Sequence, residues 1–161
     1  KTMKKTLLKL TTATFLVATM TQMAQAQMVL SVQGTNVEYM NENANGVGIS
    51  WGFEKTLENK IYSSITFDID YADIKNQALT GYSGNLKLGY SPIQNLNIYA
   101  IGSALTQSYN TTAYGFGYGG GISYNITNSI GLQAEYKTHT MTANSYEYDT
   151  SIATAGLKYS F

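Results

Sequence analysis

The chain has 161 residues, with ten basic and ten acidic side chains, so nothing in its charge balance points to a nucleic-acid partner. Charged residues make up only 12%, against about 25% in an average soluble domain, while glycine and tyrosine are abundant. This composition suits one β-domain with one face in lipid and the other face polar. The absence of cysteine excludes disulfides, thiolate metal sites, cysteine nucleophiles and an amino-terminal lipid anchor.

Residues 1–26 have the pattern of a secretory signal peptide. Met3-Lys4-Lys5 forms a basic start, residues 10–18 form a short apolar stretch, and Ala24-Gln25-Ala26 matches an A-x-A cleavage site. The alternative is a membrane anchor, but the apolar stretch falls short of the roughly 20 residues that a spanning helix needs. We therefore predict a cleaved signal peptide over residues 1–26, followed by a single mature domain over residues 27–161.

From residue 28 onward, apolar residues alternate with polar or small ones, and a period of two predicts β-strands. The clearest segment is 114–124, where aromatic and aliphatic residues alternate with glycine. In chain order, the predicted strands are 28–39, 47–54, 61–71, 82–90, 96–107, 114–124, 130–137 and 153–161. Residues 96–107 are apolar on both parities, so the sequence does not decide which side of this strand faces outward.

The predicted connections between these strands alternate in character. Turns rich in Asn, Ser and Glu are expected at 54–60, 91–95 and 125–129. Polar segments are expected on the other side, at 41–45, 73–79, 106–113 and 140–149, and two of them are longer than most of the turns. Short periplasmic turns and longer outer loops are typical of a membrane barrel with both termini in the periplasm. Tyrosines 109, 146 and 148 fall in these predicted loops, which are either solvated connectors or surfaces for binding.

In most of the predicted strands, the charged residues fall on one parity. They are Glu54, Asp68, Asp70, Lys87, Glu135, Lys137 and Lys158. A lysine on the lipid side would cost about 2–4 kcal/mol at the membrane midplane, so this parity is predicted to face the lumen. There the charges would form a structural network of ion pairs. A soluble barrel with its apolar face inside is the alternative.

Aromatic residues gather near the strand ends, where rings with a polar group prefer the two membrane interfaces. Those near the predicted periplasmic rim are Trp51, Phe53, Tyr90, Tyr124, Tyr159 and Phe161, and those nearer the outer rim are Tyr39, Tyr71, Tyr82, Tyr114 and Tyr136. The glycines of segment 115–121 lie on the opposite parity. They would leave room in a lumen that, with eight strands, is only wide enough for side chains.

The last strand resembles the carboxy-terminal assembly signal of outer-membrane barrels. Phe161 is terminal, Tyr159 is an aromatic residue two positions earlier, and Leu157 continues the alternation. Residues 131–137 are similar to the penultimate strands of the same group. The chain thus resembles the small porin-like barrels, which include the OmpA membrane domain, the OmpX and Ail group and the opacity proteins. This resemblance implies an all-β, eight-stranded, antiparallel up-and-down transmembrane barrel in the cell outer membrane of a Gram-negative bacterium.

The resemblance also implies partners but no catalytic site. The expected partners are outer-membrane lipid and lipopolysaccharide, periplasmic chaperones and the barrel-assembly machinery. Some outer-membrane barrels modify lipid A with a His and a Ser, but a deacylase would want a Ser where Met141 follows His139 by two residues. Ser145 and Ser151 lie at no diagnostic spacing. His139 is therefore interpreted as a rim or loop residue, and no catalytic residue, cofactor or metal is predicted.

The functional hypotheses concern the membrane rather than a reaction. We predict a structural or surface-interaction role, in envelope integrity or in adhesion through outer loops to a ligand that the sequence does not identify. A small solute channel is the alternative, although side chains should fill an eight-stranded lumen. A lipid-A-modifying enzyme comes third. Asp68 and Asp70 could hold a cation or act in acid–base chemistry, but a satisfied lumen network is the preferred interpretation.

Overall fold

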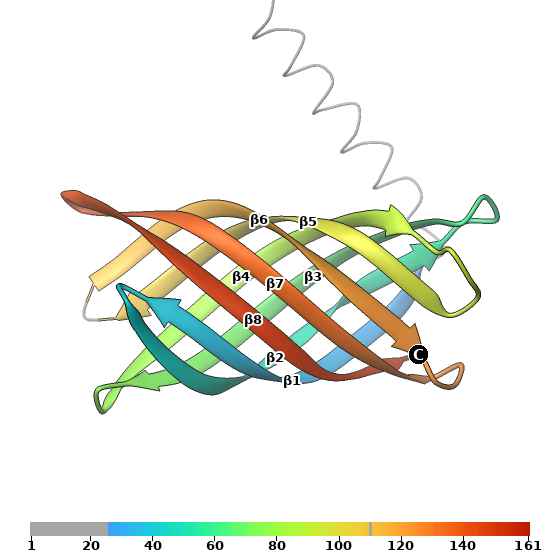
Figure 1. Cartoon of the computed structure of the whole chain (residues 1–161), viewed down its shortest axis with the longest axis horizontal. Coiled ribbons are helices and arrows are strands. Elements are labelled where there is room, and N and C mark those ends of the chain that lie inside the picture. Colours follow the sequence, from blue (N-terminus) through green and yellow to red (C-terminus); the bar gives the residue numbers. More distant parts are fainter. Residues whose placement is uncertain (1–25, 110) are drawn as a thin grey trace, which may run out of the picture.

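A computed structural model of the protein describes residues 26–109 and 111–161 (Figure 1). The predicted signal peptide therefore lies outside the described residues, apart from its last position. Within those residues, no helix has the length and apolar character needed to cross a membrane.

The described residues form eight strands that close into a barrel. The strands are β1 (Gln27–Tyr39), β2 (Glu42–Thr56), β3 (Ile61–Ile74), β4 (Gln77–Tyr90), β5 (Leu96–Tyr109), β6 (Thr111–Asn125), β7 (Ile130–Ala143) and β8 (Tyr146–Ser160). Each strand pairs antiparallel with the next one along the chain, and β1 pairs with β8. The closed sheet leaves no unpaired edge, as a lipid environment requires. The predicted eight-stranded up-and-down barrel is confirmed.

Both ends of the barrel chain lie at the same end of the barrel. Val29 near the start of β1 pairs with Ser160 at the end of β8. Figure 1 shows the carboxy terminus at this end, together with the turns after β2, β4 and β6. We call this the terminal end, and we call the opposite end, where β1–β2, β3–β4, β5–β6 and β7–β8 are joined, the hairpin end.

The prediction of longer loops on the outer side of the barrel is wrong. At the hairpin end only two residues separate β1 from β2, β3 from β4, and β7 from β8. Met40 and Asn41 have φ angles of 46° and 65°, and Lys75 and Asn76 have φ angles of 52° and 63°. Positive φ at both central residues is the mark of a type I′ turn, whose twist matches that of the flanking strands. The longer connections lie instead at the terminal end.

The strands continue through the predicted loops because the burial pattern inverts near the hairpin end. On β7, Thr140 and Thr142 are exposed on the outside, whereas Met141 and Ala143 are buried inside. Nearer the terminal end, the same strand has apolar residues outside and charged ones inside. The outward face therefore becomes polar without the strand ending.

The structure settles the orientation of β5, which the sequence left open. Tyr99, Ile101 and Ser103 face the lumen, while Ile98 and Gly102 face outward. The predicted placement of Tyr39 among the outer-rim aromatic residues is wrong. This side chain is buried in the lumen with 6% of its surface exposed. The reason is parity: β1 keeps its alternation as far as its last residue, so Tyr39 lies on the same side as Val37.

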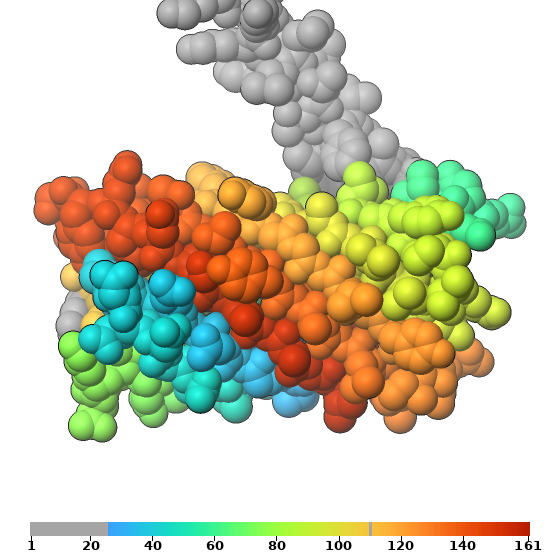
Figure 2. Space-filling view, in the orientation of Figure 1, coloured from blue at the N-terminus to red at the C-terminus, as the bar shows by residue number. Residues whose placement is uncertain are grey.

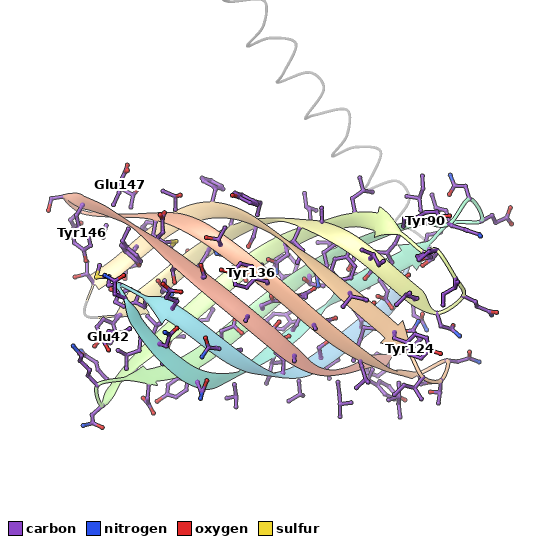
Figure 3. All side chains as sticks on the ribbon, in the orientation of Figure 1. Glu42, Tyr90, Tyr124, Tyr136, Tyr146 and Glu147 are labelled. Carbon is purple, nitrogen blue, oxygen red and sulfur yellow. The ribbon has the colours of Figure 1, made fainter. Side chains whose placement is uncertain are left out.

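The outer wall carries the apolar parity, as expected for a surface in lipid. Exposed rings project from it, most strongly Phe116 at 80% and Tyr118 at 73%. Figure 2 shows side chains covering one face of this wall from end to end, and Figure 3 shows Tyr90 and Tyr124 near the terminal end. In a soluble protein an apolar surface of this extent would be a liability for aggregation. It is the expected surface of a membrane barrel.

Candidate functional site in the barrel lumen

The inward charges form layers, and the layer nearest the terminal end joins β2 to β8. The Lys158 ammonium lies 3.0 Å from both carboxylate oxygens of Glu54. Tyr62 donates a hydrogen bond of 2.8 Å to the same carboxylate. Glu54 and Lys158 both flank β1, so the pair passes over the inner face of that strand.

The next layer joins β4, β5 and β7. Lys87 lies 2.5 Å from the carboxylate of Glu135, which also accepts a hydrogen bond of 2.7 Å from Tyr99. The Lys87 ammonium lies 5.3 Å from the centre of the Tyr99 ring, within the range of a cation–π contact. Tyr99 also packs against Tyr62 with ring centres 5.1 Å apart, so the two layers are in contact.

The third layer crosses the full width of the lumen. Lys137 on β7 lies 2.8 Å from Asp68 on β3, and both side chains are about 1% exposed. Asn85 links the pair, because it donates to Asp68 at 2.9 Å and accepts from Lys137 at 3.3 Å. A buried ion pair is tolerated when such additional hydrogen bonds satisfy its remaining atoms.

Asp70 is the one predicted network residue for which no cation lies within 4 Å in the described part of the chain. Its Oδ1 accepts a long hydrogen bond of 3.4 Å from Gln33, and its Oδ2 has no partner among the described residues. Asp70 is 3% exposed. The structure thus places all seven predicted residues inside the lumen, but it pairs only six of them.

His139 lies inside the lumen and not at the rim or in a loop, as the sequence had suggested. It is a residue of β7, 1% exposed, and its Nε2 lies 2.9 Å from the Ser103 hydroxyl. The interpretation as a loop residue failed because β7 continues to Ala143. Ser103 was missed because it lies 36 residues away on β5, and only the barrel register brings the two strands within reach. Both side chains face inward, away from membrane lipid.

The hairpin end of the lumen is filled by apolar side chains, which we call the apolar plug. It consists of Val37, Tyr39, Ala44, Ala72, Ile74, Leu79, Leu105, Ala113, Met141, Ala143 and Ile152, with Tyr109 and Tyr148 packed against it. The Tyr39 ring lies 5.0 Å from that of Tyr109 and 5.1 Å from that of Tyr148. Two of the tyrosines placed in predicted loops thus belong to the lumen, whereas Tyr146 is exposed.

The predicted carboxy-terminal signal residues lie on the outer wall. Leu157, Tyr159 and Phe161 are all more than 40% exposed. The Tyr159 and Phe161 rings meet edge to face, with their centres 4.8 Å apart. The Phe161 backbone amide donates a hydrogen bond of 2.9 Å to the Met28 carbonyl. The end of the chain is therefore fixed to β1 by its backbone, and its rings remain free on the surface.

The lumen arrangement can brace the wall, but it offers little room for chemistry on an external substrate. Ion pairs and hydrogen bonds join strands that are not neighbours, and the apolar plug covers the hairpin end. Within residues 26–109 and 111–161, no group of three or more His, Cys, Asp or Glu side chains is arranged to hold a metal ion.

Solved structures with the same fold include three natural membrane barrels. Neisserial surface protein A has 17% identity and a TM-score of 0.54, covering 84% of this chain and 97% of that one. Ail, the attachment invasion locus protein of Yersinia pestis, has 12% identity and a TM-score of 0.57, with coverage of 84% and 97%. The amino-terminal barrel domain of Pseudomonas aeruginosa OprF has 16% identity and a TM-score of 0.52, with coverage of 85% and 100%. At these identities the likeness concerns the fold alone.

Sequence comparison identifies the family. No curated protein matches the chain. The sequence signature described as "Outer membrane protein beta-barrel domain" matches residues 10–161, which is nearly the whole chain. Membership of this family implies an outer-membrane location, in agreement with the apolar outer wall. The chain therefore belongs to the outer-membrane β-barrel domain family.

Proposed function

We propose that this protein is a structural component of the outer membrane, which supports envelope integrity through its lipid-facing wall. The observation that carries the proposal is the cross-braced lumen, in which Lys137 and Asp68 join opposite walls beneath the apolar plug. Such an interior favours a rigid cylinder over a channel or an active site. The proposed partners in the membrane are lipid and lipopolysaccharide.

Adhesion through outer loops has less support than a structural role. The name of Ail refers to attachment and invasion, and one of its structures holds a heparin analogue, sucrose octasulfate. At the hairpin end of this barrel, two-residue turns leave little surface for such binding. The exposed charges there are mostly acidic and would repel a polyanion. They are Glu38, Asp73, Glu147 and Asp149, beside a half-buried Glu42 that pairs with Lys75.

Deletion of the protein in its host tests the structural role. We expect the strain to admit more of a hydrophobic dye or a bulky antibiotic through its outer membrane, and the wild-type chain to restore the barrier. The double variant Lys75→Asn with Asn76→Gly should restore it equally, because Asn-Gly suits the same type I′ turn. If only the wild-type turn restores function, a surface interaction takes the place of the structural role. An unchanged barrier in the deletion strain would contradict the proposal.

The channel and enzyme hypotheses have separate tests. In planar bilayers the purified barrel should show no steady conductance steps, because side chains span its lumen. Regular steps would favour a solute channel instead. In cells, His139→Ala should leave the lipid A profile unchanged, since His139 contacts Ser103 inside the barrel and does not face lipid. An altered profile would revive the enzyme hypothesis.

The barrel-assembly machinery and periplasmic chaperones remain proposed partners in biogenesis. The exposed rings of Tyr159 and Phe161, with Leu157 on the same face, give the carboxy-terminal strand an apolar outer face for recognition. The proposed route begins with removal of residues 1–26 by signal peptidase. Amino-terminal sequencing of protein from the outer membrane should then start at Gln27, and any other start would contradict the proposed cleavage site.

A further inference from the structure

The charges inside the lumen do not balance. Among the described inward-facing residues, four carboxylates face three lysines, which leaves one negative charge when His139 is counted as neutral. These residues are Glu54, Asp68, Asp70 and Glu135, with Lys87, Lys137 and Lys158. Each lysine has its own carboxylate, so the surplus falls on Asp70. An unpaired buried charge is costly, and inside a membrane protein it points to a function.

Other buried oxygens on the same part of the wall also lack partners among the described residues. Besides Asp70 Oδ2, the buried oxygens without a hydrogen-bond partner among the described residues include Gln33 Oε1, Thr35 Oγ1, Thr154 Oγ1 and Asp68 Oδ1. Each of these side chains is at least 95% buried. Buried polar atoms in native proteins normally have partners. A concentration of unpartnered oxygens beside an unpaired carboxylate therefore indicates a ligand that accepts electron pairs.

The barrel register gathers these oxygens on one part of the wall. Thr35 on β1 pairs directly with Thr154 on β8, so their side chains are neighbours. Gln33 lies two residues before Thr35 on the same face, and its amide contacts Asp70 from across β2. The contact is possible because the intervening residue is Gly48. A Cβ there would lie 2.2 Å from Asp70 Oδ1 and 3.2 Å from Gln33 Nε2.

We propose that these buried oxygens bind one monovalent cation, with sodium as the probe ion. Asp70 would supply the charge, and the Gln33 amide and the Thr35 and Thr154 hydroxyls would supply neutral oxygens. Oxygen donors of this kind replace the hydration shell of an alkali cation. A single surplus charge is balanced by one positive charge, because Asp68 is already paired with Lys137. A divalent ion would want more carboxylates than the site offers.

The experiment compares the stability of the full barrel in sodium chloride and in choline chloride at constant chloride concentration. Choline is a bulky quaternary ammonium ion, which side-chain oxygens cannot ligate as they ligate sodium. Urea unfolding of the wild type should show a folding constant that rises in proportion to one plus the ratio of the sodium concentration to its dissociation constant, about tenfold when that ratio is ten. Asp70→Asn should abolish the response. Asp73→Asn should keep it, because Asp73 lies on the same strand but faces outward.

Thr154→Val provides a second variant that leaves every charge in place. It should fold and should need a higher sodium concentration for the same rise. Broadening of the ²³Na resonance by the wild type but not by Asp70→Asn would show binding directly. Equal wild-type stability in the two salts would overturn the proposal. So would a sodium response that survives in Asp70→Asn. If Asp70→Asn is equally more stable than wild type in both salts, Asp70 binds no cation.

Discussion

Lys137 on β7 and Asp68 on β3 meet across the lumen, with 2.8 Å between the ammonium and the carboxylate. The two strands lie on opposite walls, four positions apart around the closed sheet. The pair is therefore a tie across the diameter of the barrel, in contrast with the Glu54–Lys158 pair, which passes over a single strand.

Replacing Lys137 with Met should destabilise the barrel strongly. The change leaves Asp68 charged, buried and unpaired, and breaking a buried pair from one side costs about 3–5 kcal/mol. Adding Asp68→Asn to Lys137→Met should recover much of this loss, since no isolated charge then remains. Urea unfolding in detergent or lipid vesicles measures both effects.

The control for this prediction is Lys75→Met, which breaks the exposed Lys75–Glu42 ion pair at the hairpin end. Its unfolding curve should overlay that of the wild type, because exposed pairs contribute little. If Lys137→Met behaves like this control, the tie across the lumen does not stabilise the barrel.

Gly121→Ala should destabilise the barrel by overpacking the lumen. An added Cβ would lie 2.6 Å from Cε2 of Tyr99, whose hydroxyl bonds to Glu135. Inserting a methyl group into a packed interior typically costs about 1–3 kcal/mol. Gly102→Ala is the matched control, because nothing lies within 4 Å of its added Cβ. Equal stability of the two variants would contradict the packing argument.

The sequence was sufficient to predict the eight strands and the charged side chains that face the lumen. Few structures other than a β-barrel in lipid have a period of two with most charges on one parity. It failed at the hairpin end for a physical reason. Beyond the apolar band the outward face is polar, and the lumen there is apolar, so the pattern inverts. Thr140, Met141 and Thr142 then look like a polar loop interrupted by one methionine, although they continue β7.

Contacts between side chains across the lumen could not be predicted from the sequence either. The pairing of His139 with Ser103, and the isolation of Asp70, depend on how far each strand is shifted against its neighbours. Tight turns fix that register, and the turn at 75–76 carries Lys-Asn rather than the Asn-Gly that most clearly signals a hairpin. Parity can be read from one strand, but partners across a barrel require the registers of all of them.

Trp51 reports whether the apolar parity faces lipid. It is the single tryptophan of the chain, it lies on the outer wall with 39% of its surface exposed, and it packs against Phe67. In vesicles with brominated acyl chains its fluorescence should be strongly quenched relative to unbrominated vesicles. Acrylamide, a quencher confined to water, should have little effect. The reverse pattern would mean that the ring faces water, as in a soluble barrel.

Phe161→Ala should impair assembly in cells more than it impairs the folded barrel. Phe161 follows the last residue of β8, its ring is 64% exposed, and the substitution keeps the backbone bond to Met28. Purified Phe161→Ala should therefore refold in detergent as the wild type does. In cells, less of it should appear in the outer membrane as a band whose mobility shifts on heating. Phe116→Ala removes another exposed ring, away from the chain end, and should assemble normally. If both variants assemble like the wild type, the terminal ring is no assembly signal. If Phe161→Ala also fails to refold when purified, its role lies in stability.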